Sequence, residues 1–279
     1  MTKCMLCGSP MRLRFKAQHS ILWCDDCAFG RIDADLTPEK VATFYGPDYY
    51  THGANGVQFP LSFVDRVLMH IAWRVDHGND HKPPASNGRP ASMCDIGCGG
   101  GENLKAYADA DYDVIGVDPD KNAAAFKSWP TLLGSAENLP HELRGRRFDV
   151  VLMSHSLEHC IDPVKAVRNA ASLLNQNGRL IVEVPNNACY AFEKYGAKWP
   201  CSDLPRHLSF FTRRSLAKIL SGAGLEPSFE YVGFCRQFHP ARKRGQKSTH
   251  THSAIQLART AFSTADLKYD SIRAVGSRL

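Results

Sequence analysis

A glycine-rich segment places the strongest constraint on the fold of this 279-residue chain. It reads Asp95-Ile-Gly97-Cys-Gly99-Gly-Gly-Glu102 and lies between a strand pattern at residues 93–96 and a helical pattern at residues 102–110. Glycines let the chain turn tightly and bring backbone N–H groups, with the helix N-terminus behind them, against a ligand. The segment therefore predicts a ligand-binding loop between a strand and a helix.

Strand and helix patterns alternate along the sequence around and after this loop. Short apolar runs predict buried strands at residues 93–96, 112–117, 131–133, 148–153 and 179–184, and helices are expected at 102–110, 121–129 and 164–174. Alternation of this kind implies a mostly parallel sheet with helices on both faces. The predicted fold class is therefore α/β.

Two acidic positions narrow the choice of ligand. Asp95 would repel the phosphates of a dinucleotide, and Glu102 stands where a dinucleotide-binding loop requires its third glycine. Asp118 ends the next strand, the position from which a carboxylate accepts both ribose hydroxyls of a nucleoside; a plain turn residue before Pro119 is the alternative. A cationic nucleoside without phosphate, S-adenosylmethionine, is the predicted cofactor.

Five motifs in order, at residues 95–99, 116–118, 134–140, 148–159 and 173–186, resemble those of class I S-adenosylmethionine-dependent methyltransferases. The similarity is closest to the small-molecule branch with quinone-biosynthesis and sugar methyltransferases. It implies a Rossmann-like sheet with the cofactor across the carboxyl ends of the strands. The implied contacts are Asp95, Gly97 and Gly99 to the methionine portion, Asp118 to the ribose, Ala136 and Glu137 to the adenine, and Ser154 and His155 beside the sulfonium.

Two Cys-x-x-Cys pairs lie in the first 27 residues, sixteen residues apart. Four thiolates can complete a tetrahedral zinc shell with no position left for a reacting water, so we predict a structural zinc ribbon over residues 1–35; a redox role for the pairs is the alternative. A ribbon before these motifs resembles the layout of bacterial deoxysugar C-methyltransferases, in which the N-terminal part covers the substrate pocket. The expected zinc ligands are Cys4, Cys7, Cys24 and Cys27.

Three further segments complete the predicted organisation. Residues 36–90 are expected to form a helical linker or lid, with an amphipathic helix at 61–75, and residues 91–235 the methyltransferase domain. Residues 236–279 carry nine Lys/Arg against two Asp and are expected to form a basic, partly disordered segment. Sheets of this family usually finish with an antiparallel hairpin; its first strand is expected at 229–234, and no convincing last strand follows.

The linker at residues 36–90 contains a predicted helix N-terminus and three tyrosines. Thr37 followed by Pro38 predicts the N-cap and first position of a short helix. Tyr45, Tyr49 and Tyr50 are expected either to close over the cofactor as lid residues or to form the packing seam between ribbon and sheet.

Two histidines, His155 and His207, are the candidate catalytic residues. His207 follows the fifth predicted strand in a Pro-x-His segment similar to one of this family, and we expect a base or a substrate contact; packing of its loop is the alternative. Quinone-type relatives place Glu-x-x-Glu-His where this chain has His155-Ser-Leu-Glu158-His159. His155 in place of the first Glu argues against a magnesium site, because magnesium prefers oxygen ligands.

The predicted function is methyl transfer to a small-molecule acceptor, with a nucleotide-linked sugar or another secondary metabolite expected. The alternative is a zinc-ribbon RNA methyltransferase, but residues 1–35 hold five Lys/Arg and four Asp, a balance that disfavours a nucleic-acid partner. The sequence has no apolar stretch of the length that a membrane span or a secretory signal requires, so a cytoplasmic protein is expected.

Overall fold

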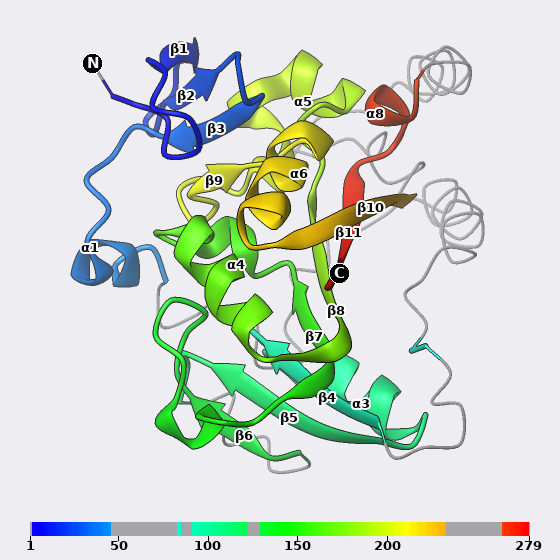
Figure 1. Cartoon of the computed structure of the whole chain (residues 1–279). Coiled ribbons are helices and arrows are strands. Elements are labelled where there is room, and N and C mark those ends of the chain that lie inside the picture. Colours follow the sequence, from blue (N-terminus) through cyan, green and yellow to red (C-terminus); the bar gives the residue numbers. More distant parts are fainter. Residues whose placement is uncertain (1, 46–82, 85–90, 122–128, 233–263, 279) are drawn as a thin grey trace, which may run out of the picture.

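The computed structural model describes residues 2–45, 83–84, 91–121, 129–232 and 264–278 (Figure 1). The helix predicted at 61–75, most of the helix predicted at 121–129, residues 236–263 of the C-terminal segment, Tyr49 and Tyr50 lie outside the described residues.

A seven-stranded sheet in the order β10-β11-β8-β7-β4-β5-β6 forms the centre of the fold. Strands β4 to β8 pair in parallel, and β11 pairs antiparallel with β8 on one side and β10 on the other. This arrangement confirms the predicted mostly parallel α/β sheet. The strands are β4 (Ala91–Ile96), β5 (Tyr112–Asp118), β6 (Thr131–Leu133), β7 (Phe148–Ser154), β8 (Leu174–Pro185), β10 (Leu225–Val232) and β11 (Ser271–Arg278).

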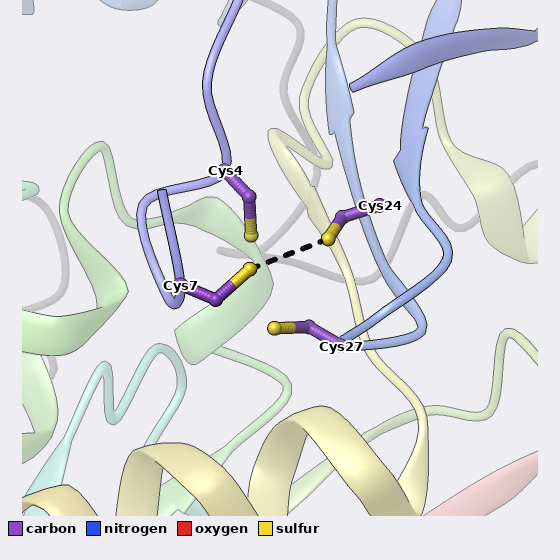
Figure 2. Close-up of side chains that lie close together, drawn as sticks. All are labelled: Cys4, Cys7, Cys24 and Cys27. Atoms are coloured by element: carbon purple, nitrogen blue, oxygen red, sulfur yellow. Dashed lines mark hydrogen bonds between the residues drawn. The ribbon is translucent and has the colours of Figure 1, made fainter. Parts of the chain in front are cut away.

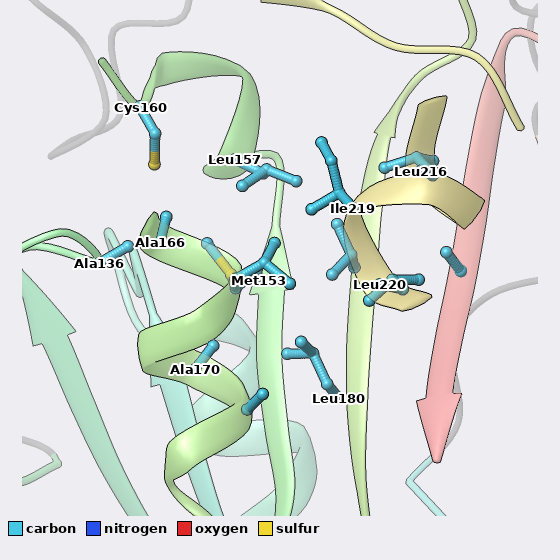
Figure 3. Close-up of a cluster of buried hydrophobic side chains, with 14 of the residues drawn as sticks. Ala136, Met153, Leu157, Cys160, Ala166, Ala170, Leu180, Leu216, Ile219 and Leu220 are labelled. Atoms are coloured by element: carbon cyan, nitrogen blue, oxygen red, sulfur yellow. The ribbon is translucent and has the colours of Figure 1, made fainter. Parts of the chain in front are cut away.

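Helices cover both faces of this sheet. Successive residues of a strand point to opposite faces, so Met153 of β7 joins the hydrophobic cluster under α4 (Pro163–Ser172) and α6 (Arg213–Gly222). Its neighbour Leu152 joins the cluster under α3 (Glu102–Ala108). Figure 3 shows the first cluster, with α4 and α6 packed side by side on the strands. Burial on two faces explains why these strands read as continuous apolar runs.

The C-terminal strand β11 is the element that the sequence analysis did not identify. It lies between β8 and β10 and hydrogen-bonds along both edges. Its side chains are mostly small or polar, and the buried residues include the charged Arg273. Backbone pairing, the ion pairs of Arg273 and the burial of Ile272 and Ala274 in the core together hold this strand, and residues 271–278 of the expected tail form an ordered part of the sheet.

The N-terminal ribbon is a second sheet that includes a strand from the methyltransferase part. Its order is β1-β2-β3-β9, with β1 (Arg12–Phe15), β2 (Ile21–Cys24), β3 (Phe29–Ile32) and β9 (Ser209–Phe210). Figure 1 shows the ribbon beside β9 and α5 (Tyr190–Tyr195). One hydrophobic cluster joins residues of β2 and β3 to Phe192 and Phe210, so the ribbon packs directly on the methyltransferase part.

Shorter elements connect these parts. Helix α1 (Pro38–Ala42) begins at Thr37, whose side chain accepts a hydrogen bond from the backbone of Lys40, as predicted. Among the described residues, no helix combines the length and the apolar character needed to cross a membrane. The remaining elements are α8 (Ala265–Lys268) and the 3-10 helices η3 (His141–Leu143), η4 (Leu157–His159), η5 (Gly196–Lys198) and η6 (Pro200–Ser202).

Candidate active site

The predicted cofactor residues gather at one edge of the sheet. The parallel strands β4, β5, β6 and β7 all end there, and ligands bind at this edge in open α/β sheets. The topology thus brings together residues from four separate motifs. They are Asp95 on β4, Gly97 and Gly99 in the loop after it, Asp118 ending β5, Ala136 and Glu137 after β6, and Ser154 ending β7, followed by His155.

Asp95 is a buried carboxylate with open hydrogen-bonding capacity. Its side chain is 0% exposed, and neither of its oxygens has a hydrogen-bond partner among the described residues. Burial raises the pKa of Asp95 to about 7; the nearby side chain of Asn103 lowers it, and the charge of Asp118 raises it further. A buried unpaired carboxylate is costly, so this position suits a ligand that supplies a positive charge.

The glycine loop is held in place by backbone geometry that only small residues permit. Gly97 has a φ of 85°, and a Cβ on it would lie 2.4 Å from the Cβ of Ser156. The backbone N–H of Gly99 donates to one oxygen of Asp118 (2.9 Å), and the N–H of Asp120 donates to the other (2.9 Å). Asp118 therefore joins the loop to the end of β5, and its carboxylate keeps lone pairs for a further partner.

The segment after β6 is fixed by helix α4. The side-chain amide of Asn169 donates to the backbone oxygens of Ala136 (2.8 Å) and Glu137 (3.0 Å). The carboxylate of Glu137 accepts from the backbone N–H of Asp162 (2.9 Å), just before α4. The side chain of Glu137 therefore binds the backbone just before α4. The adenine contact expected for Ala136 and Glu137 stays a prediction.

His155 lies between two carboxylates. Its Nδ1 is 3.4 Å from Oε1 of Glu158, and its Nε2 is 3.6 Å from Oε1 of Glu183. The side chain of His155 is 46% exposed, so solvent screens these contacts; desolvation opposes a charge on the ring, but the two carboxylates still outweigh it and raise the pKa of His155. A protonated ring cannot accept a proton, so this geometry favours a fixed cation over a base.

Glu158 and His207 are buried members of the same group of side chains as His155. Glu158 is 1% exposed, and its Oε1 is 3.9 Å from Nε2 of His207. Burial raises the pKa of Glu158, but the contact with His155 and the charges of the surrounding histidines lower it to about 2. Burial also lowers the pKa of His207 to about 4, against the attraction of the Glu158 charge. His207 is therefore a neutral imidazole beside a carboxylate.

Two residues support the ring of His207. Oδ2 of Asp203 is 3.9 Å from Nε2 of His207, and the other oxygen of Asp203 pairs with Arg206. The ring of His159 packs edge-on against that of His207, with 4.7 Å between the centroids. Nδ1 of His159 is 3.1 Å from the hydroxyl of Tyr45. Tyr45 therefore joins the linker to η4, a contact that decides between neither of the two roles expected for it.

Ligand atoms of Glu158, His159 and His207 lie within 4.8 Å of one another. Two imidazoles and one carboxylate do not fit magnesium, which prefers oxygen ligands. His155 also lies against the same carboxylate of Glu158, and its positive charge would repel a second cation. The cluster therefore does not suit magnesium, whereas two histidines and one glutamate are a ligand set that zinc accepts.

The four N-terminal cysteines converge as predicted (Figure 2). Their sulfur atoms lie within 4.8 Å of one another, and those of Cys7 and Cys24 are 3.6 Å apart. A tetrahedral zinc site with Zn–S distances of about 2.3 Å has sulfur–sulfur edges of roughly 3.8 Å. The described cysteines form no disulfide, and burial raises the pKa of Cys4 and Cys27, so a bound cation would be needed to hold both as thiolates. The geometry fits a zinc ion.

The sequence analysis did not identify Glu183, which faces His155, or Arg273, which pairs with Glu183. Glu183 stands in an apolar strand run and Arg273 in the unpredicted strand β11, and the two form a partly buried ion pair. A charged residue inside an apolar strand pattern, as at Glu183, was the one available signal.

Comparison with known proteins identifies the family. Residues 77–228, more than half of the chain, match the family model described as a methyltransferase domain. The chain therefore belongs to this methyltransferase family, and it is an S-adenosylmethionine-dependent methyltransferase.

Individual relatives agree with this assignment. The chain is 29% identical to the ubiquinone biosynthesis O-methyltransferase of Azorhizobium caulinodans over 84% of this chain and 98% of that protein. It is 32% identical to the protein of the same name from Cereibacter sphaeroides over 59% of this chain and 70% of that protein. Among solved structures, a SAM-dependent methyltransferase from Archaeoglobus fulgidus shares the fold, with a TM-score of 0.53 and 19% identity over 76% of this chain and 94% of that chain.

Proposed function

We propose that this enzyme methylates a hydroxyl oxygen of a small-molecule acceptor and that His207 is the general base. The observation that carries the proposal is the environment of His207, a buried neutral imidazole whose Nε2 is 3.9 Å from both Glu158 and Asp203. A neutral imidazole accepts a proton, and two adjacent carboxylates stabilise the imidazolium that results. The same arrangement of base and carboxylate serves other transfer enzymes.

The cofactor residues have complementary tasks in this proposal. S-adenosylmethionine, when bound, supplies an electrophilic methyl group on a sulfonium. Asp95 holds the ammonium of its methionine portion, and Asp118 accepts from its ribose hydroxyls. Gly97 and Gly99 would let the backbone approach the cofactor, the backbone at Ala136 and Glu137 would flank the adenine, and Ser154 would lie beside the sulfonium. His155, expected from the sequence as a catalytic residue beside the sulfonium, is in this proposal a fixed cation between Glu158 and Glu183.

The reaction needs little from the protein besides alignment and proton transfer. His207 takes the hydroxyl proton as the new O–CH3 bond forms and the S–CH3 bond breaks. The Glu158 and Asp203 carboxylates balance the charge that His207 gains. The proton then leaves His207 to solvent, which restores the neutral ring.

Two acceptor classes follow from different observations. The similarity to ubiquinone biosynthesis O-methyltransferases over nearly the whole of one relative favours a hydroxylated aromatic acceptor. The ribbon that packs beside His207 favours the second candidate, carbon methylation of a nucleotide-linked keto-sugar. In that reaction His207 would take the proton from the carbon next to the keto group.

We also propose that the ribbon binds a structural Zn2+ through Cys4, Cys7, Cys24 and Cys27. The convergence of four sulfur atoms at tetrahedral spacing supports this proposal. A shell of four thiolates has no open position, so the zinc takes no part in methyl transfer.

The experiment measures methyl incorporation from labelled S-adenosylmethionine into three panels, namely catechols and other phenols, nucleotide-linked keto-sugars, and RNA. We expect incorporation into phenols. His207→Gln should lower turnover on that acceptor at least 100-fold, within the range of a lost general base, and leave cofactor affinity unchanged by calorimetry. The control is His141→Gln, because His141 is 81% exposed in its side chain and lies on η3.

Normal turnover of His207→Gln would remove His207 as the base. Incorporation only into keto-sugars would select the second candidate, and incorporation only into RNA would exclude a small-molecule acceptor.

A further inference from the structure

A row of alternating charges crosses three strands and ends at the candidate site. It begins at Glu230 on β10, whose Oε2 is 3.1 Å from Nη1 of Arg273 on β11. Nη2 and Nε of Arg273 lie 3.0 and 3.1 Å from Oε2 of Glu183 on β8. Oε1 of Glu183 is 3.6 Å from His155, and His155 is 3.4 Å from Glu158. The cofactor and base assignments leave Arg273 and Glu183 without a role.

We propose that Glu183, anchored by Arg273, is a positioning residue that fixes His155 in the methyl-transfer site. The proposal rests on the proposed function, because His155 acts on the base His207 through Glu158. Neither Glu183 nor Arg273 is proposed to touch the cofactor or the acceptor.

The two carboxylate oxygens of Glu183 have different partners. Oε2 takes both donors from Arg273, whose side chain is 7% exposed, and this leaves Oε1 directed at the imidazole of His155. Two N–H groups of the planar guanidinium converge on this one oxygen, a contact that the flexible ammonium of a lysine does not reproduce. Arg273 therefore sets the direction in which Glu183 presents its free oxygen.

The backbone of His155 is held by the same residue. Its N–H donates to the backbone oxygen of Glu183 (2.8 Å), and its φ is 50°, in the left-handed region that non-glycine residues rarely adopt. A residue in this region persists only where its surroundings fix it. Glu183 thus contacts both the backbone and the ring of His155.

The charge of His155 depends on the groups that face it. These are Glu158 from η4 and Glu183 from β8, with the more distant cation Arg273 and the ring of His207 opposing them. With both carboxylates in place the ring stays protonated through neutral pH. Its charge then keeps the buried Glu158 ionised next to His207.

The first test is spectroscopic and needs no acceptor. The pKa of the His155 ring is measured by 15N nuclear magnetic resonance in histidine-labelled protein, with His155→Gln used to assign the signal. We expect wild-type His155 to titrate at about 10 and Glu183→Gln to lower that pKa by at least one unit. Glu226→Gln, an exposed carboxylate on β10, is the matched control and should leave the pKa unchanged.

The second test links the charge to turnover. Activity of the wild type should persist to about pH 9, and in Glu183→Gln the alkaline fall should begin at least one pH unit lower, with unchanged affinity for S-adenosylmethionine. Arg273→Met should lower kcat as much as Glu183→Gln, and the double variant should be no worse than either alone, because Arg273 acts through Glu183. If Arg273→Met does not fold, Arg273→Lys takes its place and should retain part of the activity.

A His155 pKa near 6.5 in the wild type, or one that Glu183→Gln leaves in place, would overturn the positioning role whatever the acceptor is. A shifted pKa with an unmoved pH profile would also overturn it, since His155 would then have no bearing on turnover. Failure of the proposed function is separate, because it is decided by His207→Gln and the acceptor panels.

Discussion

Asp118 combines a structural task with a binding task. Its carboxylate accepts backbone hydrogen bonds from Gly99 and Asp120 at 2.9 Å each, so it holds the glycine loop at the end of β5. It is also 8% exposed, at the edge where a ribose would lie. The same side chain therefore shapes the loop and provides an acceptor for the nucleoside.

Asp118→Ala should weaken binding of S-adenosylmethionine at least tenfold, or about 1.4 kcal/mol, the scale of one lost charge-assisted hydrogen bond. Calorimetric titration measures this, and adenosine should lose affinity by a similar factor because it carries the same ribose. The control is Asp113→Ala, on the same strand with a side chain 76% exposed. An Asp118→Ala variant with wild-type affinity would contradict the ribose contact.

Residues that act within one local motif could be predicted from the sequence. Asp95, Gly97 and Asp118 lie at the ends of strands whose apolar runs are visible, and parallel pairing brings those ends together. Glu183 and Arg273 could not be predicted in the same way. They lie 90 positions apart in the chain, and nothing local in either segment indicates that the other will be its partner.

The ribbon and the loop of His207 form one structural unit through β3 and β9. Gly30 and Arg31 of β3 pair with Phe210 and Ser209 of β9, and the N–H of Ile32 donates to Leu208 O (3.1 Å). Leu208 directly follows the candidate base. The ribbon thus holds the segment that carries His207.

Arg31 and Thr212 add side-chain contacts across this junction. Thr212 Oγ1 donates to the backbone oxygen of Ala28 (2.9 Å), next to Cys27 of the proposed zinc site. Arg31 donates to the backbone oxygen of Ile161 (2.8 Å). A metal ion that orders the ribbon should therefore also order the loop that carries His207, the proposed base.

Removal of the ribbon metal should loosen this loop. In zinc-finger peptides such sites contribute on the order of 10 kcal/mol to folding. We expect about one Zn2+ per chain by elemental analysis. After chelation, amide hydrogen exchange should speed up at residues 207–211 and in β3 while β4 and β5 keep their protection.

Cys24→Ser should reproduce the effect of chelation, and Cys201→Ser, an exposed cysteine outside the ribbon, serves as the control. Zinc-free protein with full protection at residues 207–211 would contradict the coupling.

The elements that could be predicted are those with apolar periodicity. Strands β4 to β7 match their predicted positions within one or two residues because both faces of the sheet are buried. Strand β11 has only a short apolar alternation, Ile272 and Ala274, with the charged Arg273 between them, and the ion pairs of Arg273 and two neighbouring strands add to its stability. Its position between β8 and β10 depends on pairing with residues far away in the chain, and the sequence carries no local sign of that pairing.

Asp95 links the stability of the whole molecule to cofactor binding. Its pKa in the fold, about 7, lies above the value of 3.8 that is usual for an exposed aspartate. The fold therefore binds this proton more tightly than the unfolded chain does, so the contribution of Asp95 to stability falls as the pH rises from about 4 to 7. At pH 8 the cofactor-free protein carries the full cost of a buried, unpaired charge.

Asp95→Asn should therefore stabilise the cofactor-free protein while it weakens cofactor binding. At pH 8 we expect the melting temperature of the variant to exceed that of the wild type by at least ~2 °C, and the difference should narrow towards pH 5 as the wild-type carboxyl gains its proton. Saturating S-adenosylmethionine should reverse the order, because a ligand that binds the folded state raises the stability of the wild type more than that of the weaker-binding variant. Asp113→Asn should show neither effect. Equal melting temperatures at pH 8, or an equal gain from the cofactor in both proteins, would mean that Asp95 is not held as an unpaired charge for the cofactor cation.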